Sequence, residues 1–462
     1  MTSINITSKS FIQAIAIFAA LAMLFPLPVM QYIGEEGLYA IKSYEMFMRQ
    51  DLLHPSILGI IWPHSPVYHW PIIGLCQLIG WEHVDIAIRF ISVCASWLSA
   101  LVAALLARHL FREHAHAGWL AAAIYLSMGE VSFWYGWLGY VDASFGCFIF
   151  TSIAALWIAI EKENAGWFLT ALLSITVAFL LKNITAYALF GLAGFVLILR
   201  MRRWHLLKRP AFLIPGLLAL SVPFAYNHFI IHSSGNAAVT FRDALRNFQG
   251  FGLLDYMGHW LSYPFIFIVR AMPVSLLIAW LWLSRKQAFR FSHDQLTLSI
   301  ILLACLAPFW LSAGGTPRYL VPLYGLAAVT LTGLSLQLEM RHLRTTIWLI
   351  TVFVLLKIPY SFGILPYIKD WMPERNVKVV AEEIMQLTAN APLRTQNDVS
   401  TGLAIAAYLD VWRQERPPIH WYQGQEKGVF IMAETASPQL GNLIKTWRLR
   451  GDTVYLYWQP EQ

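Results

Sequence analysis

Long apolar runs separated by short polar segments follow one another from residue 11 to residue 366. A helix needs about 20 apolar residues to cross the hydrocarbon core of a bilayer. On this basis we predict about eleven spans. They lie near residues 11–31, 84–107, 117–134, 143–160, 166–181, 184–199, 210–231, 262–283, 295–312, 319–337 and 345–366. The first run lacks a small-residue cleavage site, so we interpret it as a retained helix.

The composition favours a polytopic membrane protein. Hydrophobic residues make up 58% of the 462 residues, charged residues make up 13%, and the mean hydropathy is +0.55. A soluble globular protein carries a larger share of charges on its surface. The four cysteines lie in or beside apolar runs, so we expect small core residues rather than a disulfide framework or a zinc site.

Lysines and arginines in the short loops predict the orientation. One set of alternate loops is rich in basic residues, including the cluster RMRRWHLLKR at 200–209, and the opposite set holds far fewer. Basic loops stay in the cytoplasm. The net charge of +7 therefore reflects mostly topology. The sequence has no basic stripe with interleaved aromatic residues, which is the pattern that would indicate a nucleic-acid partner.

Three segments then fall on the outer side of the membrane: a long first loop at 32–83, a second loop at 232–261, and a C-terminal segment at 367–462. In the last segment, NVKVVAEEIMQLTANA has a helical period, whereas GVFIMA and DTVYLYWQ are typical of strands. We therefore predict an α-helical polytopic membrane domain at 1–366 and a small α/β domain at 367–462, outside the cytoplasm.

Charged residues at the outer edge of the predicted spans are the candidate chemistry. A charge at the centre of a membrane helix costs about 2.5–3.5 kcal/mol on insertion scales, so each one requires a reason. The set comprises Glu35, Glu36, His64, Arg89, Asp142, Lys182 and Arg318. Taken singly, each is most often a loop residue or a snorkelling anchor. Because acids and bases from separate loops meet on one face, we favour a functional site.

These motifs, in this order, resemble the polyprenyl-phosphate-sugar-dependent glycosyltransferases, which include the aminoarabinose transferases of lipid A and the protein O-mannosyltransferases. The motifs are GEEGLYA, DLLHPSILGIIWPHSPVYHW, IRF, GYVDASF, LLKN and PRYLVPLY, and the match covers roughly residues 10–340. The chain departs from the family pattern at four positions, where Glu35 replaces Asp, Leu38 replaces Arg, His64 replaces Lys and Asn183 replaces Gly.

The resemblance implies a GT-C fold, in which membrane helices carry the site and an outer domain covers it. It also implies that the enzyme uses no nucleotide sugar and no metal cofactor. Two adjacent carboxylates also suit Mg²⁺ or Mn²⁺, so that alternative stays open. We also predict substrate-positioning roles for Tyr39, Tyr68, Arg89 and Tyr319.

The chemistry of a polyprenyl-phosphate donor accounts for the same residues. Its phosphate is a good leaving group, so displacement needs positive charge rather than a proton donor. We predict that His64, Lys182 and Arg318 bind the donor phosphate. We predict that Glu35 is the general base that removes the acceptor proton, while Glu36 and Asp142 orient the sugar or tune Glu35. A single displacement of this kind inverts the anomeric carbon.

The sequence thus predicts a multi-pass glycosyltransferase of a bacterial inner membrane, with its C-terminal domain in the periplasm or outside the cell. The sugar would pass from a polyprenyl-phosphate donor to a glycolipid such as lipid A, a glycan or a protein. Two other interpretations stay open. A transporter or flippase for a lipid-linked sugar would use the same charges for binding alone, and an assembly partner of other membrane enzymes would need none of them.

Reporter fusions test the predicted orientation. A fusion at residue 205 should report the cytoplasm and a fusion at residue 400 the outer side, because the basic loops stay inside. If residue 400 instead proved to be cytoplasmic, the predicted convergence of acids and bases on the outer face would be wrong.

Overall fold

The computed structural model describes residues 7–29, 31–62, 65–226, 228–229, 252–312, 314–389, 391–413 and 416–461. The chain forms two compact units. The first comprises residues 1–24, 92–137 and 141–358, and the second comprises residues 25–91, 138–140 and 359–462. Each unit is therefore built from segments that are far apart in the sequence.

The first unit is a bundle of apolar helices. Two of its helices, α4 (Val84–Leu110) and α16 (Met340–Pro359), extend into the second unit. The others are α1 (Lys9–Ala22), α5 (Ala117–Ser127), α6 (Gly129–Phe133), α7 (Val141–Lys162), α8 (Ala165–Leu181), α9 (Thr185–Met201), α10 (Pro210–Tyr226), α12 (Leu253–Arg270), α13 (Val274–Leu283), α14 (His293–Trp310) and α15 (Tyr324–Ser335). Each predicted apolar run overlaps at least one of these helices.

Helix length and composition agree with a multi-pass membrane protein. Within the described ranges, four helical segments are long and apolar enough to cross a membrane: Trp81–Leu110, Val141–Lys162, His293–Trp310 and Met340–Trp371. Shorter apolar helices, such as α8, α9 and α10, accompany them. The number of spans stays a prediction.

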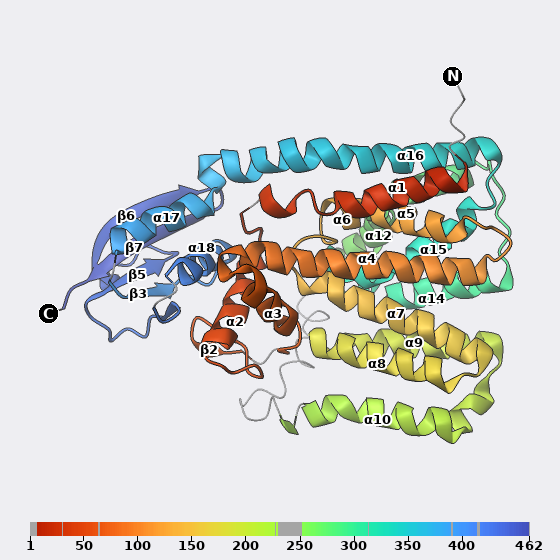
Figure 1. The fold of residues 1–462 in the computed structure, drawn as a ribbon, viewed down its shortest axis with the longest axis horizontal. Coiled ribbons are helices and arrows are strands. Elements are labelled where there is room, and N and C mark those ends of the chain that lie inside the picture. Colours follow the sequence, from red (N-terminus) through yellow and green to blue (C-terminus); the bar gives the residue numbers. More distant parts are fainter. Residues whose placement is uncertain are drawn as a thin grey trace. The chain divides into compact units, whose positions relative to one another are not determined.

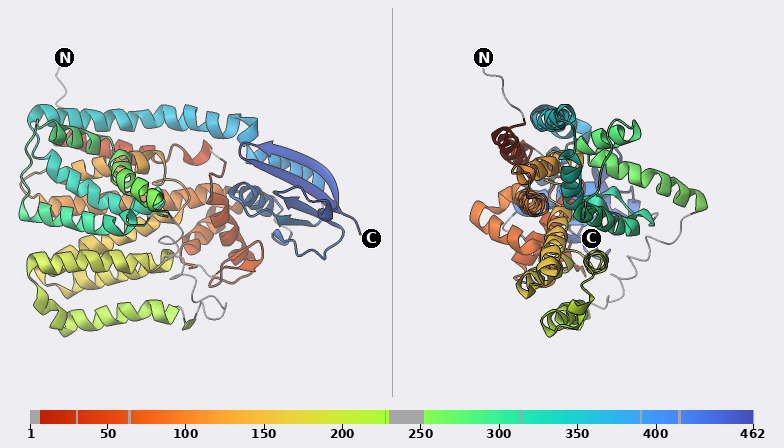
Figure 2. Two further views of the ribbon diagram at one scale, coloured as in Figure 1. Left: turned by 180° about the vertical axis from the view of Figure 1, so that it is seen from behind. Right: turned by 90° about the vertical axis from the view of Figure 1, so that its right-hand side faces the viewer.

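Helix α7 is the most deeply packed of the four long apolar helices, because 83% of an apolar 18-residue stretch of this helix is buried. It contacts α8 and α9, and Figure 1 and Figure 2 show these helices side by side. A 3₁₀ segment, η6 (Pro317–Leu323), also packs on α7. A Cβ atom at Gly146 would lie 3.2 Å from the Cα of Pro322, so the small residue lets η6 approach α7 closely.

Two predicted segments differ from the structure. The range 262–283 is not one helix, because α12 ends at Arg270 and α13 begins at Val274, directly after Pro273. Proline lacks the N–H that would continue a helical ladder. The predicted outer loop 232–261 is also shorter than expected, since α12 already begins at Leu253. Residues 232–251 of that loop lie outside the described residues.

The second unit combines part of the first predicted loop with the C-terminal segment. The loop forms α2 (Glu36–Met48), β1 (Ser56–Ile57), β2 (Ile60–Ile61) and α3 (His69–Ile79). The C-terminal segment forms α17 (Val377–Thr388), α18 (Ser400–Trp412), β3 (Leu393–Gln396), β4 (His420–Trp421), β5 (Val429–Ala433), β6 (Asn442–Leu449) and β7 (Asp452–Gln459). The helix expected at NVKVVAEEIMQLTANA and the strands expected at GVFIMA and DTVYLYWQ are α17, β5 and β7.

The five C-terminal strands form one sheet in the order β4-β3-β5-β7-β6. Strand β3 pairs in parallel with β4 and β5, whereas β7 pairs antiparallel with β5 and β6. The predicted placement of residues 367–462 outside the cytoplasm, and the boundary at residue 366, stay predictions.

Helices α2 and α18 pack against each other within the second unit. A Cβ atom at Gly37 would lie only 2.7 Å from the Cα of Ala404, so the helices meet backbone to backbone at this point. The backbone N–H of Tyr32 donates to the Oη of Tyr408 at 3.1 Å, and the two ring centroids lie 4.4 Å apart with the rings tilted by 40°. Helix α18 therefore holds the chain segment that leads into α2.

Candidate active site

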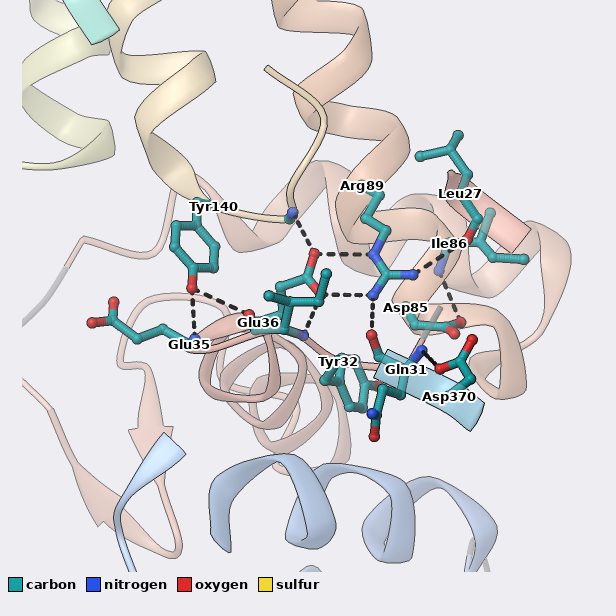
Figure 3. Close-up of polar contacts among 12 residues, drawn as sticks. Leu27, Gln31, Tyr32, Glu35, Glu36, Asp85, Ile86, Arg89, Tyr140 and Asp370 are labelled. Atoms are coloured by element: carbon teal, nitrogen blue, oxygen red, sulfur yellow. Dashed lines mark hydrogen bonds and ion pairs between the residues drawn. The ribbon is translucent and has the colours of Figure 1, made fainter. Parts of the chain in front are cut away.

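Glu36 and Arg89 form a fully buried ion pair in the second unit (Figure 3). Arg89 Nη2 lies 2.6 Å from Glu36 Oε2, and Arg89 Nε lies 3.0 Å from Oε1. The carboxylate also accepts the backbone N–H of Gly139 at 2.7 Å and that of Ile33 at 2.8 Å. An ionised carboxylate offers about four acceptor positions, so these four donors satisfy Glu36 completely.

Arg89 also fixes the backbone that precedes α2. Its Nη2 donates to the carbonyl of Gln31 at 2.6 Å, and its Nη1 donates to the carbonyl of Leu27 at 3.3 Å. Glu36 lies in the first turn of α2, where the positive end of the helix dipole stabilises a carboxylate. The ion pair thus anchors both the start of α2 and the segment before it.

Glu35 points away from this network, as Figure 3 shows. Its backbone N–H donates to the Oη of Tyr140 at 2.8 Å, and that hydroxyl donates to the carbonyl of Ile33 at 3.2 Å. Its side chain is partly exposed, whereas Glu36 is buried. Gly34 has a φ of 56°, and a Cβ there would lie 2.3 Å from the Oη of Tyr140, so only glycine fits this turn. The backbone of Glu35 is therefore fixed, while the residue itself is partly exposed.

Lys42 is a candidate residue that sequence reasoning did not select. It lies two turns after Glu35 along α2, and its exposed fraction is 3%. Burial lowers the pKa of Lys42 to about 7, and the negative charge of Glu35 opposes this shift. Residues seven apart share a helix face, so the spacing in GEEGLYAIK is a signal by which it could have been found.

An aromatic cluster surrounds the predicted positioning tyrosines. The ring of Tyr39 packs edge-on against Tyr68 at 5.2 Å and lies 6.0 Å from Tyr140. The neighbouring His69 is buried, and its Nδ1 lies 2.9 Å from the Oγ of Ser43. Because Ser43 donates to the carbonyl of Tyr39, it accepts from His69. Tyr39 thus joins α2 to α3 and to the hydroxyl that holds Glu35.

A second group of charged residues lies in the first unit. Asp142, in the first turn of α7, forms an ion pair with Lys182, which caps the C-terminal end of α8. Both positions suit the helix dipoles. Lys182 Nζ also lies 4.8 Å from the ring centroid of Tyr319, and the guanidinium of Arg318 lies 5.6 Å from the same ring. Asp142 Oδ2 is buried and has no hydrogen-bond partner among the described residues.

The predicted site residues therefore fall into two groups. The second unit holds Glu35, Glu36, Tyr39, Tyr68 and Arg89, and the first unit holds Asp142, Lys182, Arg318 and Tyr319. His64 lies outside the described residues. Two side chains have other partners than we expected, because Glu36 and Arg89 bind each other and the backbone. Within the described ranges, no three His, Cys, Asp or Glu side chains are grouped so that they could hold a metal ion.

Removing one partner of the Glu36–Arg89 pair should destabilise the protein strongly. Arg89→Ala leaves a buried carboxylate without its cation, which costs about 3–5 kcal/mol in free energy of unfolding. Arg49→Ala is the matched control, because Arg49 pairs with Asp51 at a site where both side chains are about one-third exposed. Such a pair contributes about 0–1 kcal/mol. Unfolding of the purified variants in detergent should separate them, and equal losses would contradict the anchoring role.

Lys42 should make the stability rise with pH. The folded protein releases this proton near pH 7, whereas an exposed lysine in the unfolded chain keeps it to about pH 10.4. Between these values the unfolded chain binds more protons, so the free energy of unfolding increases with pH. Melting temperatures at about pH 6, 7.5 and 9 should therefore rise more steeply for the parent than for Lys42→Met. The exposed Lys427→Met is the control, and parallel curves for parent and Lys42→Met would count against the shift.

The sequence is similar to known glycosyltransferases. The family model for dolichyl-phosphate-mannose-protein mannosyltransferases matches residues 63–226. The undecaprenyl phosphate-alpha-4-amino-4-deoxy-L-arabinose arabinosyl transferase of Pseudomonas aeruginosa strain UCBPP-PA14 is 29% identical over 303 residues, which cover 63% of this chain and 53% of the relative. A second transferase of that name, from Proteus mirabilis, is 30% identical over 221 residues, which cover 47% of this chain and 34% of the relative. The chain thus spans about half the length of the first of these relatives, and less of the second.

Solved structures share the fold. ArnT from Cupriavidus metallidurans, bound to undecaprenyl phosphate, has a TM-score of 0.73 at 16% identity, covering 97% of this chain and 98% of that chain. The oligosaccharyltransferase of Archaeoglobus fulgidus in its apo form has a TM-score of 0.50 at 11% identity, covering 92% and 70%. Part of the chain is therefore similar in sequence to glycosyltransferases that use polyprenyl-phosphate-linked sugars, and the chain shares the GT-C fold of the solved structures.

Proposed function

We propose that this protein transfers a sugar from a polyprenyl-phosphate donor to an acceptor at the outer face of a bacterial inner membrane. The observation that carries the proposal is the contrast between two adjacent carboxylates. Glu36 is buried and accepts four hydrogen bonds, whereas Glu35 is partly exposed on a fixed backbone. Carboxylates in such different environments take different roles.

Glu35 is the general base in this proposal. Its backbone is held by Tyr140, and its carboxylate is turned away from Arg89. A carboxylate within hydrogen-bond reach of the acceptor hydroxyl removes the proton as the oxygen attacks the anomeric carbon. The attack comes from the face opposite the phosphate, so the product has the inverted configuration. Glu36 and Arg89 position this base without contacting the sugar.

Lys42 offers the next site for the proton. The acceptor hydroxyl gives its proton to the Glu35 carboxylate, which then passes it to the neutral amine of Lys42. The amine is available because burial lowers the pKa of Lys42 to about 7. Transfer to Lys42 restores the ionised base and leaves the lysine as the cation.

Lys182 and Arg318 bind the donor phosphate in this proposal. Both cations lie against the ring of Tyr319. Arg318 suits a phosphate because the guanidinium group donates two parallel hydrogen bonds. Lys182 is paired with Asp142 before the donor binds, and the phosphate then shares this cation. Asp142 Oδ2 remains available to accept a sugar hydroxyl, and His64, when protonated, adds a third positive charge.

The names of the relatives suggest the first substrates to test. An undecaprenyl phosphate carrier with 4-amino-4-deoxy-L-arabinose is the donor that the names of the curated relatives give. We propose a donor of this class, and a hydroxyl or phosphate of a glycolipid such as lipid A, a glycan or a protein as the acceptor. Mass spectrometry of glycolipids and glycans from cells with and without the gene identifies the product.

The Glu35→Gln variant tests the proposed base. Turnover should fall by about 10²- to 10⁴-fold, because the amide cannot accept the proton, while donor binding should stay close to that of the parent. Sugar transfer and donor-lipid binding are measured on the same purified protein. Glu374→Gln, at an exposed position of the second unit, should leave both unchanged. Near-parental turnover of Glu35→Gln would rule out Glu35 as the base.

A further inference from the structure

The first unit contains an apolar pocket of about 330 Å³ that the proposed reaction does not use. Its walls come from one face of α13, at Ser275, Ile278, Ala279 and Trp282, and from one face of α15, at Ala327, Thr330, Leu331 and Leu334. The last turn of α12, at Phe267 and Ile268, and Leu302 of α14 also line the pocket. Phe289 and Phe291 line the end at the segment that joins α13 to α14. The lining positions on α13 extend over about 10 Å at 1.5 Å per residue.

The two hydroxyl residues of the pocket offer its occupant no free hydrogen-bond donor. Ser275 Oγ donates to the carbonyl of Ile268 at 2.6 Å, and Thr330 Oγ1 donates to the carbonyl of Leu326 at 2.9 Å. The remaining lining side chains are aliphatic or aromatic. A hydrocarbon chain therefore fits these walls better than a sugar or a peptide, whose polar groups would lose their partners on entry.

Basic residues flank the end of the pocket formed by Phe289 and Phe291. Arg290 lies between these two phenylalanines, and Arg285 and Lys286 follow the lining residue Trp282 in the sequence. All three basic residues are exposed, and Lys286 Nζ lies 4.1 Å from the ring centroid of Trp280. The backbone N–H of Arg290 donates to Gln337 Oε1 at 2.9 Å, which fixes this segment on the end of α15.

We propose that the pocket binds one acyl chain of an anionic phospholipid and that Arg285, Lys286 and Arg290 bind its phosphate. The joining segment belongs to the basic loops that the sequence predicts to be cytoplasmic. Phospholipids of the cytoplasmic leaflet carry negative charge and attract such residues. Exposed aromatic side chains beside the basic cluster are typical of the bilayer interface.

This phosphate position is separate from the proposed donor phosphate position. Arg200, at the end of α9, donates to Thr297 near the start of α14, and Gln337 binds both Gln295 of α14 and the basic segment. The basic cluster therefore lies at the same end of the bundle as Arg200. Lys182 lies before the start of α9, about 25 Å away along that helix. One phosphate group cannot contact both.

Lipid binding to the purified full-length protein tests the proposal. Dioleoyl phosphatidylglycerol should bind and raise the melting temperature, whereas dioleoyl phosphatidylcholine, with the same chains, should bind at least about tenfold more weakly. Binding is followed by native mass spectrometry and thermal unfolding. Equal binding of the two lipids would overturn the proposal, and this comparison needs no variant. Displacement of the bound phosphatidylglycerol by equimolar undecaprenyl phosphate would also overturn it, by assigning the pocket to the polyprenyl lipid.

Variants separate the two parts of the site. Arg285→Gln with Arg290→Gln should weaken phosphatidylglycerol binding by about tenfold or more, whereas Arg202→Gln with Arg344→Gln, which removes the same charge from the same predicted face, should not. Ala279→Phe fills the pocket and should abolish binding, and Ala211→Phe on the exposed side of α10 is its control. If the double arginine variant binds phosphatidylglycerol as tightly as its control and the parent do, the proposal is wrong. The same holds if Ala279→Phe binds the lipid as tightly as Ala211→Phe and the parent do.

Discussion

The buried carboxylates Glu36, Asp142 and Glu130 need a compensating cation beside them, and the arrangement of the candidate residues depends on that constraint. An unpaired ion in an apolar interior costs several kcal/mol. This cost is a large part of the free energy of unfolding of a typical domain. Glu36 meets this requirement with Arg89, and Asp142 meets it with Lys182. Glu130 of α6 and Arg270 of α12 form a third such pair. Each pair joins segments that are distant in the sequence, so it positions chain as well as charge.

The helical part of the fold was largely predictable from the sequence, because apolar runs of sufficient length have few alternatives in a bilayer. The boundaries were less so. The interruption at Pro273 was missed because the flanking residues are as apolar as those of a continuous span, and only the proline signals the break. The strands β5 and β7 could be predicted because their residues favour strands and polar turns bound them, whereas the short β4 has only two residues, His420 and Trp421, and shows no pattern.

Most of the candidate residues could be selected from the sequence, but the partners that they have in the structure could not. Glu35 and Glu36 are the same residue type at adjacent positions, and only the fold distinguishes them. The partners of Glu36 are Arg89 and the backbone of Gly139, which are 53 and 103 residues away along the chain. No local pattern contains that information. Lys42 differs, because its seven-residue spacing from Glu35 follows from helix geometry alone.

The contact between Gly37 and Ala404 gives the C-terminal segment a role that its composition does not suggest. Helix α18 supplies none of the candidate catalytic side chains, yet it presents small residues, Gly402, Ala404, Ala406 and Ala407, on the helix that packs on α2. A chain that ended before residue 400 would lack α18, against which the first turn of α2 packs. Side-chain size at Ala404 is thus restricted by the same close approach that restricts Gly37 in the motif GEEGLYA, although the two positions share no chemistry.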